Sequence, residues 1–441
     1  MKNFWFILVF LSGFLKAQDS LTWKDCVSFA IENNLTINRY RFDEQLAKLD
    51  YRQQINNLLP QIGGSASYGI NIGRSVDPGT NDIVNQEFFQ TSFGIGGSVD
   101  IFKGFVNMNR IALQRKNREL SKNLIEAVKN EISFNVLEYY ISTLFYKGLV
   151  DVCEEKTEVS KAELQRCIRQ KDVGLLAGTD IYEAEAKLAA DSLELVKAKG
   201  AYQSALLQLK STMNYPPEKD FSLNPILDYE DHLILDTISA DSLISLSFRH
   251  LPQIKAAEKK LELAKKLLAI QRGYLSPQLY FNAGWGSGYF ETFKDSMNRI
   301  IPFKQQFDLN SNQYFELSLQ VPIFNAFNQR TNIQKAKINL LKAQNEFKNE
   351  IIIQEYEINK ALLDNQNAKS EFTSTLKQLD KQKKAFQAAQ KKRETGLISL
   401  VDFYIISNQL ASVKAENIRA TMQYFLQAVT IEFYMNGKII D

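Results

Sequence analysis

The sequence predicts an α+β membrane protein, in which four β-strands per chain contribute to a shared transmembrane barrel and the rest forms long antiparallel coiled-coil helices. Three observations predict this fold. Four segments alternate apolar residues with small or polar ones, residues 105–171 and 326–392 contain no proline, and short motifs recur after about 220 residues. The recurrence indicates an internal two-fold repeat.

The first residues have the pattern of a secretory signal peptide. Lys2 supplies the positive charge, Phe4 to Leu15 the apolar stretch, and Leu15-Lys16-Ala17 the cleavage triplet. We therefore expect a signal peptide over 1–17 and a mature chain from Gln18. The lysine in the triplet leaves an uncleaved anchor as the alternative, although the apolar run is shorter than the ~20 residues of a spanning helix.

Composition and charge exclude several functional classes. A mean hydropathy of −0.26 is too polar for a bundle of membrane helices, and the net charge of +3 is too small to indicate a nucleic-acid partner. The cysteines, Cys26, Cys153 and Cys167, are too few for a disulfide framework and are interpreted as structural thiols. His232 and His250 have no partners at metal-ligand spacing. We expect no enzyme activity, no catalytic or metal site, and no cofactor.

Four segments alternate with period two, which predicts strands over about 62–72, 89–102, 278–289 and 313–324. One face of each strand is apolar and the other is small and polar, and each strand has about the 9–11 residues needed to cross a membrane. Pro60 and Pro277 disfavour helical geometry in the residues before them, so each marks the change from an incoming helix to a strand.

The proline-free stretches predict helices of about 100 Å. Their partner helices carry apolar residues spaced by seven, which predicts coiled-coil packing. These residues are Ile181, Leu188, Leu195, Tyr202 and Leu209 in one helix and Phe372, Leu379 and Phe386 in another.

The repeat sets the expected domain boundaries. Pro60-Gln61-Ile62 recurs as Pro277-Gln278-Leu279, and Gly174-Leu175 as Gly396-Leu397. We expect a first repeat over 18–214, a linker or equatorial segment over 215–238, and a second repeat over 239–441. Helical hairpin turns are expected at about 173–180 and 395–402.

Four strands cannot close a barrel alone, and an open sheet edge in lipid leaves backbone groups unpaired at several kcal/mol each. The smallest common barrels have eight strands, so at least a dimer is required, and a trimer would have twelve. The alternative is a structural or adhesive protein whose β-domain is carried on coiled-coil stalks.

The two hairpin motifs carry a family resemblance. Residues 173–181 (VGLLAGTDI) and 395–403 (TGLISLVDF) resemble the two helix-hairpin turns of the TolC family of outer-membrane efflux proteins. The resemblance implies a homotrimer in the outer membrane and its lipid, with a twelve-stranded barrel and a periplasmic helical tunnel. It also implies a periplasmic adaptor (membrane fusion protein), an inner-membrane pump, and a passive exit duct for small molecules or proteins in efflux or type I secretion.

The resemblance also implies site residues. The hairpin tips, with Gly174, Leu175, Gly396 and Leu397, are the expected adaptor contacts, although both glycines would also serve simply to end a long helix. Asp180, Arg393 and Asp402 are the gate and tip candidates, although the two aspartates would also serve simply as helix N-caps, Asp180 forming a capping box with Glu183. The family's gating arginine is replaced by Ile398, an acidic ring position by Ile405, and a gating tyrosine by Arg393. We therefore expect an altered gate, with an ion pair between Asp180 and Arg393.

Overall fold

The computed structural model describes residues 20–77, 81–173, 178–225 and 239–440. The expected signal peptide, the Gly174-Leu175 tip and most of the linker lie outside these ranges. The chain forms two compact units, one of residues 1–40, 125–252 and 352–441 and the other of residues 41–124 and 253–351.

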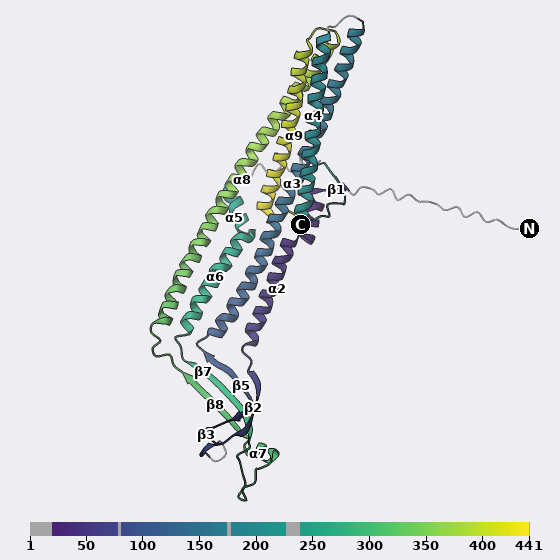
Figure 1. Cartoon of the computed structure of the whole chain (residues 1–441). Coiled ribbons are helices and arrows are strands. Elements are labelled where there is room, and N and C mark those ends of the chain that lie inside the picture. Colours follow the sequence, from purple (N-terminus) through teal and green to yellow (C-terminus); the bar gives the residue numbers. More distant parts are fainter. Residues whose placement is uncertain (1–19, 78–80, 174–177, 226–238, 441) are drawn as a thin grey trace, which may run out of the picture. The chain divides into compact units, whose positions relative to one another are not determined.

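The main elements follow one order twice: two helices, two strands, two helices (Figure 1). The first series is α1 (Trp23–Asn33), α2 (Leu35–Asn56), β2 (Gln61–Asn71), β5 (Phe88–Lys103), α3 (Val106–Asp172) and α4 (Gly178–Met213). The second is α5 (Ala240–His250), α6 (Pro252–Gly273), β7 (Gln278–Phe290), β8 (Asn312–Gln320), α8 (Asn328–Glu394) and α9 (Leu400–Asn436). Short elements are β1 (Ser20–Leu21), β3 (Arg74–Val76), β4 (Ile83–Asn85), β6 (Ser222–Leu223) and α7 (Phe303–Leu309).

Among the described residues of the unit that contains both chain ends, the regular elements are helices, apart from the short parallel pair β1–β6. Thr22 begins α1 with a capping box, because its side chain accepts from the Asp25 N–H at 3.2 Å and its own N–H donates to the Asp25 carboxylate at 2.8 Å. The packed core next to this cap joins α1, α3 and α4, and removing each fully buried side chain from water contributes about 1.5–3 kcal/mol. Its buried members are Cys26, Val27, Ala30, Val136, Tyr140, Leu144, Leu206, Leu209, Met213, Phe221 and Leu223.

The second unit contains an antiparallel sheet in the order β2-β5-β7-β8 (Figure 1). In the single chain this sheet is open, because β2 and β8 each have a strand on one side only. β8 ends at Gln320, whereas the alternation predicted a strand to about 324. Pro322 accounts for the difference, since proline has no N–H to donate to a strand ladder.

Among the described residues, no helix contains an apolar stretch sufficient to cross a membrane. The three cysteines are buried and free, as structural thiols are expected to be.

Candidate functional site: sheet faces and hairpin turns

The sheet has two chemically different faces. Residues paired directly across antiparallel strands point to the same face, so the register decides which side chains meet. Ala66 pairs with Phe93, Ile95 with Trp285, and Phe281 with Leu317. The apolar face contains Ile62, Ala66, Tyr68 and Ile70 of β2, Phe89, Phe93, Ile95, Val99 and Phe102 of β5, Leu279, Phe281, Ala283, Trp285 and Tyr289 of β7, and Phe315, Leu317 and Leu319 of β8.

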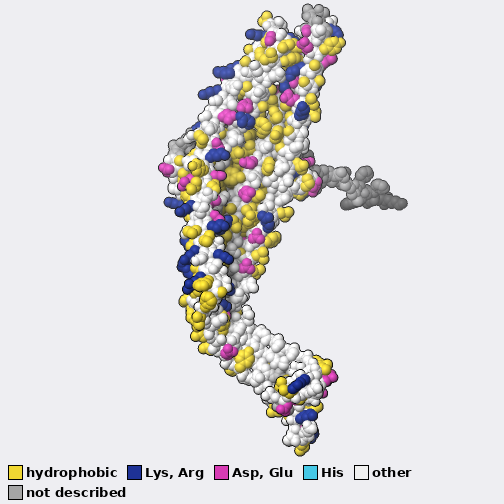
Figure 2. All heavy atoms as spheres, turned by 60° about the vertical axis from the view of Figure 1, so that its left-hand side comes forward, with side chains coloured by type: hydrophobic (Ala, Val, Ile, Leu, Met, Phe, Trp, Pro, Cys, Tyr) yellow, Lys and Arg dark blue, Asp and Glu magenta, His cyan; other side chains and the backbone are white. Residues whose placement is uncertain are grey.

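The opposite face carries glycine and small polar residues. Ser67 pairs with Ser92, their hydroxyls 2.6 Å apart, and Ser98 pairs with Asn282. Figure 2 shows the sheet region as mostly white, that is, polar side chains and backbone, with hydrophobic and charged groups at its loop end. Such a face is suited to water, whereas the apolar face is suited to lipid.

In the helical unit, α8 and α9 are joined by residues 395–399, a shorter turn than the expected 395–402. Gly396 has φ +74°. The Leu397 N–H donates to the Lys392 carbonyl at 2.8 Å and the Gly396 N–H to the Arg393 carbonyl at 3.3 Å, which is the Schellman arrangement of a helix end. Glycine is required because its left-handed backbone is strained for other residues.

Leu397 projects from this turn with 77% of its surface exposed. Its neighbour Ile398 instead packs on a buried cluster at the end of the helices. That cluster consists of Cys167, Ala184, Ala389, Leu400, Phe403 and Tyr404, contributed by α3, α4, α8 and α9.

Neither aspartate is an N-cap. The cap of α9 is Ser399, whose hydroxyl accepts from the Asp402 N–H at 3.0 Å and donates to the Asp402 carboxylate at 2.7 Å. Because α4 already begins at Gly178, Asp180 lies inside its first turn. An acidic residue there interacts favourably with the positive end of the helix.

The expected ion pair between Asp180 and Arg393 is wrong. The Arg393 side chain turns inward against α3, and its Nε lies 2.9 Å from Glu163 Oε2. Its Nη2 also lies 3.9 Å from Cys167 Sγ. In the part of the chain that the structure describes, no ion pair joins Arg393 to Asp180.

A second arginine holds the same helix end. Arg166 Nη2 donates to the carbonyls of Arg393 and Glu394 at 2.6 and 2.9 Å. A cation therefore forms hydrogen bonds with backbone carbonyls at the C-terminal end of α8, which have no partner within the helix. Its Nη1 lies 3.8 Å from Glu163 Oε1. Neither Glu163 nor Arg166 was among the site residues predicted from the sequence. Their i,i+3 spacing in α3 was the only signal, and it does not reveal a partner in α8.

Asp191 forms a buried charged cluster between α3, α4 and α9. Its side chain is 1% exposed and forms ion pairs with Lys156, at 3.2 Å, and with Lys187. The Ser160 hydroxyl donates a hydrogen bond to the same carboxylate. Lys187 continues to Asn408 Oδ1 of α9 at 3.2 Å. Burial opposes the positive charge of Lys156, but its hydrogen bonds to carboxylates outweigh this effect and raise its pKa.

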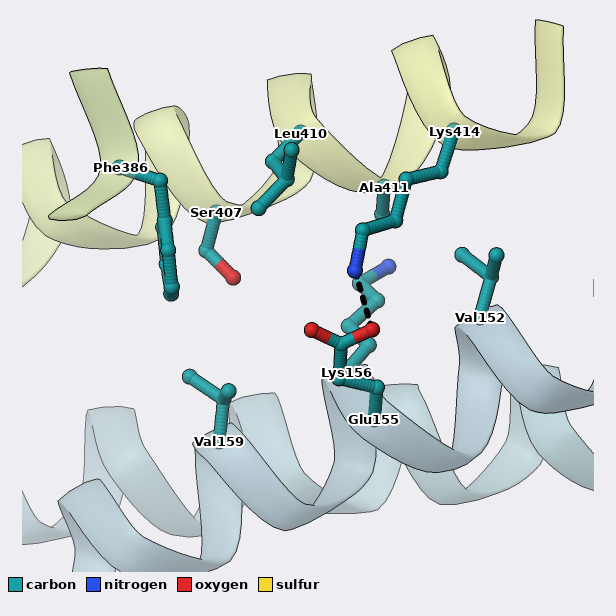
Figure 3. Close-up of a pocket in the computed structure, with 9 residues that line it drawn as sticks. All are labelled: Val152, Glu155, Lys156, Val159, Phe386, Ser407, Leu410, Ala411 and Lys414. Atoms are coloured by element: carbon teal, nitrogen blue, oxygen red, sulfur yellow. Dashed lines mark hydrogen bonds and ion pairs between the residues drawn. The ribbon is translucent and has the colours of Figure 1, made fainter. Parts of the chain in front are cut away.

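A cavity of about 20 Å³ lies nearby between α3, α8 and α9, with room for about one water molecule (Figure 3). Figure 3 shows Val152, Val159, Phe386 and Leu410 pointing into it, and Lys414 bridging to Glu155 across the helices. This space is too small for an organic ligand. Among the described residues, no cluster of three or more metal-ligating side chains occurs.

A family model described as "Outer membrane efflux protein" matches this chain over residues 26–214 and again over 243–437. The chain belongs to the outer membrane efflux protein family. This membership confirms the resemblance that the hairpin motifs indicated, the outer-membrane location, and the expectation of a channel-type protein rather than an enzyme.

Individual relatives of this outer membrane efflux protein are distant. The cobalt-zinc-cadmium resistance protein CzcC of Cupriavidus metallidurans is 23% identical over 175 residues, which is 40% of this chain and 41% of CzcC. The match therefore spans about two fifths of that relative's length.

Solved structures of similar fold align with nearly the whole of this chain. A crystal structure of CusC has a TM-score of 0.80 at 17% identity, covering 94% of this chain and 91% of its own. The Campylobacter jejuni outer membrane channel CmeC also has a TM-score of 0.80 at 17% identity, covering 94% and 85%. At this identity the likeness shows the fold.

Proposed function

We propose that this outer membrane efflux protein is the channel subunit of a tripartite efflux or type I secretion system, a passive exit duct for small molecules or proteins. One observation carries the proposal: a four-stranded sheet with one continuous apolar face, a polar opposite face, and a free edge at both β2 and β8. In lipid those edges require partners.

The strand directions allow closure by copies of the chain. Successive strands of the sheet are antiparallel, so β2 and β8 run in opposite directions and β8 of one copy can pair antiparallel with β2 of the next. Three copies give twelve strands and a polar lumen. Exposed apolar residues also follow single faces of α2 and α8, which would form the helical part of the same seams. They are Phe42, Leu46 and Leu49 of α2 and Ile338 and Leu341 of α8, all in the unit that contains the sheet.

Disulfide crosslinking tests the closure. Ser65→Cys and Ser67→Cys in β2, each combined with Ser318→Cys in β8, should give a ladder of crosslinked species that ends at three chains, and the parent protein should conduct in a planar bilayer. The matched control is Ser98→Cys with Asn282→Cys, already paired within one chain, which should crosslink only internally. A monomer that forms no pores would instead support the alternative of a structural or adhesive protein with coiled-coil stalks.

We further infer two repeats, over 18–214 and 239–441, joined by the segment 215–238. The two separate matches of one family model and the equal lengths of corresponding helices support this division. α1 and α5 both have 11 residues, α2 and α6 have 22, and α3 and α8 have 67.

The hairpin tips are proposed as the adaptor contact, with Gly396 and Leu397 at one tip and Gly174 and Leu175, outside the described residues, at the other. Leu397 supports this because an exposed leucine on a tight turn has little structural reason to be apolar. Leu397→Asp should abolish copurification of the periplasmic adaptor without loss of trimer, and Leu397→Met should retain it. Adaptor binding by Leu397→Asp at the parent level would exclude this contact.

Arg393, Asp180 and Asp402 remain proposed gate and tip residues. Because Arg393 is buried against Glu163, an opening that parts α8 from α3 must break that pair. Arg393→Ala should then raise single-channel conductance and antibiotic uptake, and unchanged values of both would remove Arg393 from the gate.

The name of the CzcC relative makes divalent metal cations one cargo to test. Deletion of this protein should then increase sensitivity to cobalt, zinc or cadmium salts. An unchanged metal tolerance together with increased sensitivity to organic toxins would assign the duct to another cargo.

A further inference from the structure

The loop between β7 and β8, residues 291–311 (the α7 loop), folds back over the apolar face of the sheet. Phe307 packs against Phe93 and Trp285, with ring centroids 5.8 and 5.5 Å apart, and Phe303 packs against Tyr289 at 5.7 Å. Phe93, Trp285 and Tyr289 all belong to the apolar face by register. The short helix α7 therefore covers part of the surface that the proposed function assigns to lipid.

Polar contacts fix α7 in this place. The Gln306 side chain is fully buried, accepts from the Phe290 N–H at 2.9 Å, and donates to the Phe290 and Ile301 carbonyls at 3.0 and 2.8 Å. Ser287, which points to the apolar face, donates to the Phe307 carbonyl at 2.5 Å. A buried amide with its hydrogen bonds made holds the loop in one position, because losing these bonds would leave buried polar groups unpaired.

The covered part lies in the outer half of the strand. β7 runs for 13 residues from Gln278, at the helix end of the sheet, to Phe290, at the loop end (Figure 1). Trp285 is past its midpoint, about 17 Å along the strand from Phe290 at a rise of roughly 3.3 Å per residue. The apolar band of such barrels is about 25 Å tall, so in a barrel built from these strands α7 would lie in the half of the band nearer the loops.

The exposed side chains of the α7 loop have the composition of a membrane interface. Met297, Ile300, Phe303 and Leu309 are exposed apolar residues. Exposed among them are the cations Lys294, Arg299 and Lys304 and the anion Asp308, and Arg299 pairs with Asp295 at 2.9 Å. An apolar surface edged by charged side chains, cations among them, fits the boundary between acyl chains and headgroups.

The apolar surface continues from α7 towards the helix end of the sheet. A hollow of about 380 Å³ opens on the same face, lined almost entirely by apolar groups, including Pro60, Ile62, Phe281 and Phe315. Trp285 both lines this hollow and packs on Phe307. The α7 loop is thus continuous with the lipid-facing band.

We propose that the α7 loop is embedded in the outer leaflet of the membrane, where α7 replaces lipid against β5 and β7. Phe303 and Leu309 contact acyl chains, and Lys304 meets anionic headgroups. This inference rests on the proposed function, because it takes the apolar face as the lipid-facing side of a barrel.

Depth-dependent quenching tests the proposal on the full-length protein in vesicles of phosphatidylethanolamine and phosphatidylglycerol. Leu309→Cys, at a residue 61% exposed, is labelled with bimane and quenched either by lipids doxyl-labelled near the headgroup or by aqueous iodide. Leu317→Cys on β8, 63% exposed, is the lipid-facing reference, and Ile83→Cys in the β2–β5 loop, 64% exposed, is the aqueous reference. Native cysteines are buried, so the unsubstituted protein measures background labelling.

The Leu309 probe should show at least half the lipid quenching of the Leu317 probe and less than half the iodide quenching of the Ile83 probe. Iodide quenching equal to that at Ile83 overturns the proposal, and shielding from both quenchers, which would indicate a protein partner, overturns it too. Loss of lipid quenching at Leu317 would instead contradict the barrel itself. Phe307→Ala should move the Leu309 probe towards iodide and leave the Leu317 probe unchanged.

Discussion

Arg393 of α8 and Glu163 of α3 form an ion pair with Nε and Oε2 2.9 Å apart, and their side chains are only 9% and 11% exposed. The pair joins two long helices near the hairpin turn. A pair so far removed from water is costly to break, because removing either group leaves the other as a buried charge that has lost its nearest counter-ion, although Glu163 keeps its contact with Arg166 at 3.8 Å.

Glu163→Gln and Arg393→Met, each as a single change, should therefore destabilise the hairpin end by about 3 kcal/mol. The double variant should be more stable than the sum of the single effects predicts, because neither member of the pair then carries a charge. Amide exchange across residues 395–399 measures the change. Asp380→Asn, which breaks an exposed pair with Lys384, is the control and should change exchange little. Additive single effects would show that the two groups do not interact.

Gly396→Ala should destabilise the turn by about 1 kcal/mol, because alanine is strained at φ +74° although nothing lies within 4 Å of its added carbon. Gly200→Ala in α4 is the matched control, since its surroundings are equally open and its backbone is helical. It should stabilise α4 by about 0.5–1 kcal/mol. Thermal unfolding with local amide exchange distinguishes the two, and the same sign at both glycines would refute the explanation.

Asp191→Ala should cost about 3 kcal/mol, because it leaves the half-buried Lys156 and Lys187 without their shared, buried carboxylate. Glu194→Gln removes a more exposed partner of Lys156, at 2.5 Å, and should cost less than about 1 kcal/mol. Denaturant unfolding of the two variants measures the difference. Equal losses would mean that burial does not determine the contribution of each carboxylate.

A pH dependence is expected where α3 packs on α6. Burial opposes the charge on Glu119 and Glu262, but hydrogen bonds from Lys116 and Lys259 outweigh it and hold the pKa of both carboxyls below the ordinary range. A lowered folded-state pKa contributes stability above the unfolded value of about 4.3. That contribution is lost as pH falls through the folded-state pKa.

Melting temperature measured between pH 7 and pH 3 should therefore fall more steeply for the parent protein than for Lys259→Met. Lys129→Met, at a lysine whose partner Glu126 is largely exposed, should keep the parent's slope. An equally steep fall in melting temperature for Lys259→Met and the parent protein would contradict the explanation that Lys259 lowers the pKa of the two carboxyl groups.

The sequence by itself determined the kind and order of the elements. Period-two alternation indicated strands because a sheet between water and lipid has two unlike faces, and the absence of proline allowed helices of 67 residues. The glycine of the second turn followed from the backbone that a helix end requires. These are local properties, because each depends on residues only a few positions apart in the sequence.

The tertiary structure decided which residues meet. Arg393 pairs with Glu163, 230 positions away, and not with Asp180. Ser399, and not Asp402, caps α9, and Trp285 is covered by α7 from the following loop. Such pairings depend on the rotation and register of long helices and on the path of a loop, and a shift of one residue would replace every partner. Local periodicity cannot choose among registers, because many satisfy it equally well.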